Sequence, residues 1–157
     1  MRILIADDDE AGCEPLCASL EVDGHVVTHA FDGEAALELL LSERFDVAIF
    51  DLDMPRKDGA SVVRELRERS IELPIILASG NGNVKRVARE LGVSHALLKP
   101  FGLDELKMAL RELASGSPEA ESWEDATPSS RFPSHEVSTH VRLRYRVPPT
   151  GKVENDR

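Results

Sequence analysis

A buried apolar run of this 157-residue chain ends abruptly on an acidic residue. The run Val47–Phe50 stops at Asp51, and Asp53 follows two residues later. Pro55 argues against continuation as a central strand, because proline cannot donate a hydrogen bond to a sheet ladder. A strand that ends in this way delivers a carboxylate to the rim of a sheet. The sequence therefore indicates that the charge at Asp51 has a chemical role.

Three other apolar runs also end on polar or charged residues. Asp7 and Asp8 close the first run of the chain, Ser79 closes the fourth, and Lys99 closes the fifth. If the runs are parallel strands in the order 2-1-3-4-5, these residues meet Asp51 at one edge of the sheet, where such folds bind ligands. The second run brings no polar group, which fits its outer place in that order.

Clustered carboxylates at this edge would repel one another, so each would hold a proton more tightly than usual unless a cation intervenes. Mg²⁺ suits such a site, because it prefers oxygen ligands and takes only a few of them from protein. We expect Asp8 and Asp51 to be direct ligands and Asp7 to bind through water. The backbone carbonyl of Asp53 is expected to supply a third protein oxygen.

With the metal in place, one oxygen of Asp51 is expected to stay free as a nucleophile. Phosphoryl transfer depends mostly on positioning and on neutralising the equatorial oxygens of the transferred group. Mg²⁺ would take one such oxygen, the Lys99 ammonium another, and the Ser79 hydroxyl with adjacent backbone N–H groups the third. The expected product is an aspartyl phosphate on Asp51.

The elements that must position these residues follow from hydrophobic periodicity across residues 1–114. Short continuous apolar runs alternate with helical patterns, which implies a parallel sheet covered by helices on both faces. The fold class is therefore α/β, a flavodoxin-like, doubly wound, five-stranded parallel sheet with strand order 2-1-3-4-5. The predicted strands are residues 3–6, 25–29, 47–50, 74–78 and 93–98.

Caps and stripes locate the helices between these strands. Pro15 lies near the expected start of the first helix, where a missing N–H has little effect. Cys13 and Cys17 share the inner stripe of that helix with two leucines, so we expect both to be core residues. Asp32 is expected to cap the second helix, whose inner stripe includes Leu41.

Composition excludes several classes of protein. The formal net charge of −10 argues against a nucleic-acid or anionic-membrane binder, since both need a basic surface. Two cysteines are too few for a secreted disulfide scaffold, and the five histidines show no metal-ligand spacing. The first apolar run is too short for a signal peptide, and no stretch approaches the roughly 20 apolar residues of a membrane span. We expect a cytoplasmic protein.

Composition changes at Ser115, and residues 115–157 form a linker and tail rich in proline and serine. Low periodicity predicts that this part is largely disordered. Residues 137–147 have some strand character, because Arg142, Arg144 and Arg146 alternate with apolar residues. That alternation fits an edge strand, a segment that docks on a partner, or neither.

Four segments of residues 1–114 resemble the receiver domain of two-component response regulators and occur in the order of that family. They are 3–9 (ILIADDD), 50–55 (FDLDMP) with Asp58-Gly59, 74–80 (PIILASG) and 98–101 (LKPF). The resemblance implies a phosphodonor, a sensor histidine kinase or phosphotransfer protein, whose phosphohistidine passes its group to Asp51. Phosphorylation would then shift a two-state equilibrium and draw Ser79 toward the phosphate. A Lys99–Pro100 bond in the cis form is also common in that family.

One position departs from the family pattern. The family commonly has an aromatic residue three positions before the lysine, as part of the switch, and Ala96 stands there in this chain. Neighbouring His95 does not replace it, because alternation along a strand points it to the opposite face. The residues expected for phosphoryl transfer are therefore all present, whereas the aromatic residue that usually takes part in the conformational switch is missing.

Three other functions remain as alternatives. The segment around Asp51 and Asp53 also resembles the first motif of haloacid-dehalogenase-like phosphatases, but the acidic pair that those enzymes need after the lysine has no candidate on a strand end. Residues 141–148 faintly resemble the opening strand of an EAL-type cyclic-di-GMP phosphodiesterase, so the chain could be a receiver module or remnant of such an enzyme. A receiver that docks without being phosphorylated is the third alternative.

The favoured interpretation is a single-domain response regulator that is not an enzyme and has no DNA-binding output of its own. It is expected to switch conformation when Asp51 is phosphorylated and to signal to a protein target. The sequence names neither the kinase nor that target, and it leaves the phosphate lifetime and the oligomeric state open.

Overall fold

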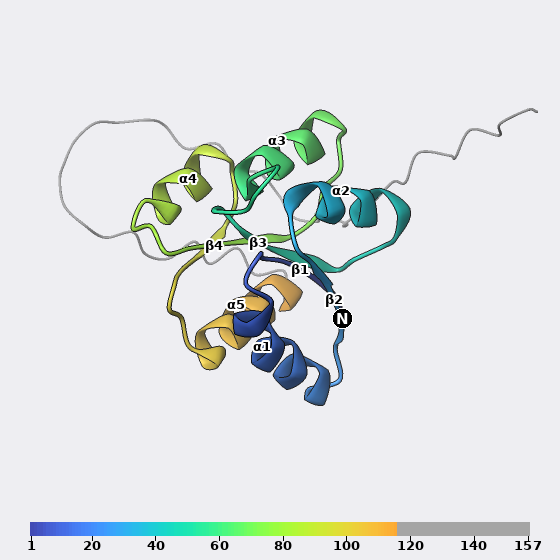
Figure 1. The fold of residues 1–157 in the computed structure, drawn as a ribbon, viewed down its shortest axis with the longest axis vertical. Coiled ribbons are helices and arrows are strands. Elements are labelled where there is room, and N and C mark those ends of the chain that lie inside the picture. Colours follow the sequence, from blue (N-terminus) through green and yellow to red (C-terminus); the bar gives the residue numbers. More distant parts are fainter. Residues whose placement is uncertain (116–157) are drawn as a thin grey trace, which may run out of the picture.

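The computed structural model describes residues 1–115, which form a single parallel sheet with helices between successive strands (Figure 1). The strand order is β2-β1-β3-β4-β5, so the predicted α/β class and strand order are confirmed. The predicted tail and the strand character at 137–147 lie outside the described residues. The elements are β1 (Arg2–Ala6), α1 (Glu10–Val22), β2 (Val26–Ala30), α2 (Gly33–Ser42), β3 (Val47–Asp51), α3 (Gly59–Glu68), β4 (Ile75–Ser79), α4 (Val84–Glu90), β5 (His95–Leu98) and α5 (Leu103–Ser115).

The sheet lies between two helical layers. Helices α2, α3 and α4 cover one face, and α1 and α5 cover the other (Figure 1). Alternation along β1 supplies both cores: Leu4 and Ala6 join the cluster under α2–α4, whereas Ile3 and Ile5 join the cluster under α1 and α5. The central strands β3 and β4 are buried along their whole length and are apolar up to their last residues, Asp51 and Ser79. Within residues 1–115, none of the helices has the length and apolar character needed to cross a membrane.

Aspartates at the loop ends start three of the helices that follow strands, namely Asp9 for α1, Asp32 for α2 and Asp58 for α3. The Asp32 carboxylate accepts hydrogen bonds from the backbone N–H groups of Glu34 and Ala35, at 2.8 and 2.9 Å, which confirms the predicted cap. The Asp58 carboxylate caps α3 by accepting from the Ser61 N–H at 2.7 Å. Each cap lets the chain turn from a strand end into a helix within a few residues.

Two predictions about helices are wrong. Leu41 is 43% exposed, because it follows buried Leu40 by one residue and is therefore rotated by about 100° around the axis. Helix α1 begins at Glu10, so Pro15 lies inside it and removes the N–H that would bond to the Ala11 carbonyl. The helix continues to Val22 despite that missing bond.

Gly59 permits a close contact between α3 and the end of β3. A Cβ atom at residue 59 would lie 2.4 Å from the backbone carbonyl oxygen of Asp51 and 3.0 Å from the Cβ atom of Phe50. Real side chains do not approach backbone oxygens so closely. The absence of a side chain at Gly59 therefore sets how near the first turn of α3 comes to Asp51.

We expect Gly59→Ala to lower the free energy of unfolding by about 1–3 kcal/mol, because the start of α3 must move away from the Asp51 carbonyl. Urea denaturation followed by circular dichroism measures this. Gly82→Ala is the matched control, since a Cβ atom there meets nothing within 4 Å, and its change should stay within about 0.5 kcal/mol. Equal effects of the two substitutions would contradict the close contact.

Candidate functional site

The strand register brings the predicted site residues together. Ala6 pairs with Phe50 between β1 and β3, so Asp7 and Asp51 are the next residues on adjacent strands. Asp51 pairs with Ala78 between β3 and β4, which places Ser79 one residue beyond it. All these residues therefore lie at the carboxyl edge of the sheet.

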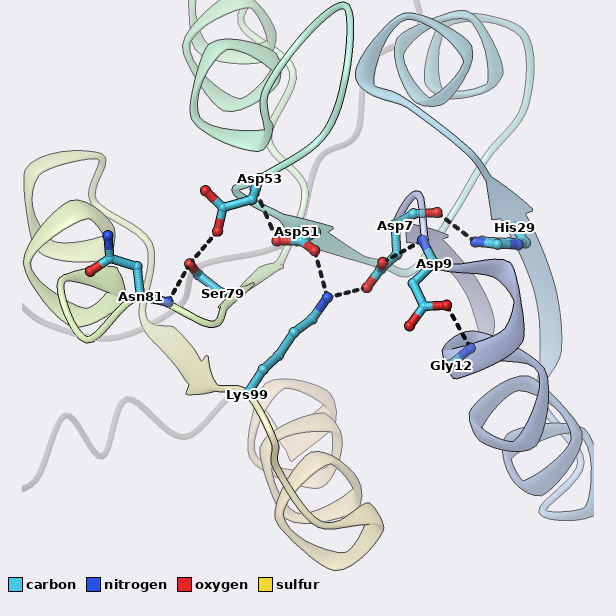
Figure 2. A network of polar contacts seen from close by, with 9 residues as sticks. All are labelled: Asp7, Asp9, Gly12, His29, Asp51, Asp53, Ser79, Asn81 and Lys99. Atoms are coloured by element: carbon cyan, nitrogen blue, oxygen red, sulfur yellow. Dashed lines mark hydrogen bonds and ion pairs between the residues drawn. The ribbon is translucent and has the colours of Figure 1, made fainter.

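Lys99 lies between two of the carboxylates. Its ammonium nitrogen is 2.5 Å from Asp7 Oδ2 and 2.5 Å from Asp51 Oδ2 (Figure 2). Asp7 and Asp51 are buried, with 8% and 6% of their surface exposed. Because charge interactions strengthen as water is excluded, this ammonium is the main compensation that the described residues give the two carboxylates.

Both oxygens of Asp51 already have a hydrogen-bond donor. Oδ2 accepts from Lys99, and Oδ1 accepts from the backbone N–H of Asp53 at 2.9 Å. The prediction of a free oxygen applies to the site with its metal and stays a prediction. A carboxylate oxygen carries two lone pairs, however, so each oxygen keeps the capacity for a further interaction.

Ser79 is directed to Asp53 in this structure. Its side chain is fully buried, and its hydroxyl donates to Asp53 Oδ2 at 2.8 Å while accepting from the Asn81 backbone N–H at 3.0 Å (Figure 2). The sequence leaves the role of the Asp53 side chain open and places Asn81 only in the loop after the fourth strand. The hydroxyl is thus close to the site but committed to another partner.

The acidic cluster has the chemistry of a divalent-metal site. One carboxylate oxygen from each of Asp7, Asp8 and Asp51 lies within 4.8 Å of the others. Three carboxylates and the one ammonium of Lys99 leave two negative charges uncompensated within this group, which matches a divalent cation. The predicted backbone ligand, Asp53, is not part of that side-chain cluster, and its role stays a prediction.

The surroundings shift the protonation of two side chains. Burial lowers the pKa of Lys99, but hydrogen bonds and charge from Asp51 and Asp7 outweigh it, so the net pKa is raised. Burial, with the charge of Asp7 added, raises the pKa of the Cys13 thiol to about 12. Cys13 is thus a neutral, buried neighbour of the site, as predicted for a core residue, whereas Cys17 is half-buried.

A cavity of about 570 Å³ opens beside the cluster. Its polar end contains Asp7 and Lys99, and its walls come from the first turns of α1 and from the segment between β5 and α5. An incoming group could therefore approach Asp7 and Lys99 from this side. The lining residues are Asp7, Asp9, Gly12, Cys13, Pro15, Leu16, Lys99, Pro100, Phe101 and Leu103.

One residue of β2 contributes to the site, contrary to the prediction that this strand brings no polar group. His29 pairs with Ile5 of β1, and its Nε2–H donates to the Asp7 backbone oxygen at 2.9 Å (Figure 2). The ring also lies 4.6 Å from that of Phe31. A search for polar residues near the end of every strand, rather than directly after it, would have found His29.

The predictions for β5 are confirmed. Ala96 packs against the core under α2–α4, whereas His95 faces α5, where its Nε2 lies 2.9 Å from Glu112 Oε2. The Lys99–Pro100 peptide bond is cis. No aromatic ring therefore stands at residue 96.

Comparison with known proteins identifies one family. The model of the response regulator receiver domain matches residues 3–111. Response regulator MprA of Mycobacterium ulcerans is 43% identical over 115 residues, which are 72% of this chain and 50% of that protein. The MprA proteins of Mycobacterium tuberculosis are 42% identical over the same length. The chain therefore spans about half the length of the curated relatives it matches.

Solved structures give the same result. The receiver domain of the Francisella response regulator 1452 superposes with a TM-score of 0.69 at 33% identity, covering 73% of this chain and 96% of that one. Response regulator TrrA of Thermotoga maritima, solved in complex with Mg²⁺-BeF, has a TM-score of 0.66 at 30% identity and covers 71% and 97%.

We expect Lys99→Met to lower the free energy of unfolding by about 2 kcal/mol in metal-free buffer near pH 7, because it leaves Asp7 and Asp51 without their ammonium. The raised pKa of Lys99 sets the pH dependence. Its contribution is complete below the ordinary lysine pKa of about 10.4 and is lost as pH rises through the higher folded value. The gap between wild type and variant should therefore close above that pH in denaturation curves.

Lys107→Met provides the matched control. Lys107 pairs with Asp23 at 2.6 Å and is similarly exposed, but its partner side chain is 39% exposed and can return to water. The control should lose less stability than Lys99→Met. If Lys107→Met lowered the free energy of unfolding as much as Lys99→Met, the buried carboxylates would not make the Lys99 ion pairs stronger than a surface pair.

Proposed function

We propose, from the premise that this chain belongs to the response regulator receiver family, that Asp51 accepts a phosphoryl group from the phosphohistidine of a sensor histidine kinase or phosphotransfer protein. The observation that supports this most is the place of Asp51. It ends β3 as a buried carboxylate beside Lys99, with Asp7 and Asp8 close enough to share a cation. A cavity opens beside Asp7 and Lys99, and Lys99 contacts this carboxylate.

The reaction that we propose is a direct displacement. An oxygen of Asp51 gives an electron pair to phosphorus, the phosphorus–nitrogen bond of the donor breaks, and its electron pair returns to the imidazole ring. The product is an acyl phosphate, in which the Asp51 side chain no longer carries its own charge. Lys99, held by Asp51 and Asp7 before the reaction, would then bind a phosphoryl oxygen.

Mg²⁺ is the proposed cofactor, with Asp8 and Asp51 as direct ligands, Asp7 bound through water and the Asp53 carbonyl as a further oxygen. When bound, it supplies positive charge to the oxygens of the transferred group. The excess negative charge of the carboxylate cluster supports this assignment. The residues of the chain provide the remaining positioning, since Lys99 and the Asp53 N–H orient the Asp51 carboxylate.

The proposed switch begins at Ser79. Its hydroxyl donates to Asp53, and it must leave that carboxylate before it can bind a phosphoryl oxygen on Asp51. The incoming dianionic group attracts the hydroxyl and repels the Asp53 carboxylate, so both effects favour the transfer of this hydrogen bond. The Asn81 N–H is bonded to the same hydroxyl, so the loop between β4 and α4 would move with it. Residue 96 is alanine, so no aromatic ring at that position can move together with Ser79.

The output is also part of the proposal. We assign the chain a non-enzymatic signalling role in the cytoplasm, with a protein rather than a nucleic acid or membrane as its target. The net charge of −10 favours this, because it opposes binding to polyanions. Asp104 and Glu105 open α5 and do not end a strand, which counts against the phosphatase alternative. The segment that resembles an EAL-type enzyme lies outside the described residues.

Incubation with acetyl phosphate and Mg²⁺ is expected to add one phosphoryl group, seen as a mass gain by intact-protein mass spectrometry. Asp51→Asn should lose this gain, because an amide cannot form the acyl phosphate. Asp58→Asn is the control, since asparagine preserves the α3 cap and Asp58 is outside the carboxylate cluster. It should label normally.

Unchanged labelling of Asp51→Asn would reject the site assignment. Absence of labelling in the wild type, with either acetyl phosphate or a panel of histidine kinases, would favour a docking receiver that is not phosphorylated. Sustained release of phosphate from an ester substrate would instead favour the phosphatase alternative.

Mg²⁺ is expected to stabilise the wild type by about 1.4 kcal/mol at ten times its dissociation constant. Asp8→Asn should lose most of that gain while being more stable than wild type without metal, because it removes a like charge from the cluster. Thermal unfolding with and without Mg²⁺ tests both the smaller gain from Mg²⁺ and the higher stability of the metal-free variant. Asp104→Asn, an exposed acid of α5, should keep the full gain. If Mg²⁺ stabilised Asp8→Asn as much as the wild type, Asp8 would not be a metal ligand.

A further inference from the structure

The loop between Asp51 and α3 contains a strained turn. Arg56 has a φ angle of 60°, in the left-handed region that non-glycine residues rarely adopt. The N–H of Lys57 donates to the carbonyl of Pro55 at 2.6 Å, which closes a three-residue turn around Arg56. Turns of this hand are rare, and they persist only where other contacts hold them.

An ion pair with α2 holds this turn. The guanidinium of Arg56 contacts Oδ2 of Asp32, while Oδ1 of the same carboxylate caps α2. The Arg56 side chain is 62% exposed, but that of Asp32 is only 3% exposed. Because one partner is buried and fixed by its capping bonds, the pair differs from an ordinary surface ion pair, whose two ends are both mobile.

The loop backbone also lies directly against the start of α2. A Cβ atom at Gly33 would be 2.2 Å from the carbonyl oxygen of Lys57, so the two segments are in close contact. On the other side, the Lys57 ammonium contacts Glu65 of α3. The turn is therefore fixed between two helices, and Arg56 makes the side-chain contact to α2.

We propose that Arg56 is a positioning residue for the metal and phosphoacceptor site. Its ion pair with Asp32 holds the loop in the strained turn, and the loop in turn fixes Asp53, whose N–H orients Asp51 and whose carbonyl is the proposed metal ligand. This inference rests on the proposed function, because it assigns a role toward the same site.

The sign of the effect on Mg²⁺ binding separates positioning from simple electrostatics. Arg56 is a cation, so removing its charge should leave Mg²⁺ binding unchanged or strengthen it if charge alone matters. If Arg56 holds the loop, removing it should weaken binding, because Asp53 is then held less firmly. Partners that orient a metal ligand typically change affinity by roughly tenfold or more when they are lost.

The test uses the full chain and titration calorimetry with Mg²⁺. Arg56→Gln should raise the dissociation constant by roughly tenfold. Arg56→Lys should retain part of the affinity through its charge. Arg56→Gly should bind better than Arg56→Gln, because glycine adopts the left-handed turn without support. Arg2→Gln is the control, since Arg2 pairs with Glu43 at the opposite end of β1.

Hydrogen exchange of the metal-free chain gives a readout that does not depend on phosphorylation. The amides of Asp53 and Lys57 are both hydrogen-bonded within the loop, and both should exchange faster in Arg56→Gln than in wild type. Asp32→Asn preserves the cap but weakens the ion pair, so it should reproduce the faster exchange.

Two outcomes would overturn the positioning role. One is unchanged or tighter Mg²⁺ binding by Arg56→Gln, and the other is unchanged exchange of the Asp53 and Lys57 amides. Failure of the proposed function looks different, because the wild type itself would then take up no phosphoryl group. The exchange experiment still decides the role of Arg56 in that case.

Discussion

Like charges held together at a sheet edge are the constraint on which this structure depends. Asp7, Asp8 and Asp51 come from two adjacent strand ends and repel one another, and Lys99 from the end of β5 bridges two of them. That arrangement requires β1, β3 and β5 to end at the same edge, which the parallel sheet provides. The rest of the fold, two apolar layers and short capped loops, holds these strand ends in place.

The fold and the membership of the site could be predicted from sequence because both follow from local signals. Continuous apolar runs that stop on Asp51, Ser79 or Lys99 mark buried strands and the edge where they end. Capping by Asp32 likewise depends on residues close in the chain. Such signals identify which residues lie together at the sheet edge, but they do not identify which atoms are in contact.

The actual partners within the site could not be predicted, because they depend on register and loop geometry. Ser79 donates to Asp53 rather than toward Asp51, and each oxygen of Asp51 already accepts one hydrogen bond. His29 reaches the Asp7 carbonyl from a strand whose sequence ends without an acid. The left-handed turn at Arg56 has no sequence signal, since glycine or asparagine would be the usual residue there.

The position of Lys99 along the chain has a consequence for synthesis on the ribosome. The carboxylates are made within the first half of the described residues, whereas their ammonium partner lies 92 residues after Asp7 and 48 after Asp51. A nascent chain that has not yet released β5 therefore carries the acidic cluster without this counter-charge. Repulsion among these carboxylates then opposes closure of the sheet edge until Lys99 has emerged and can pair with Asp7 and Asp51.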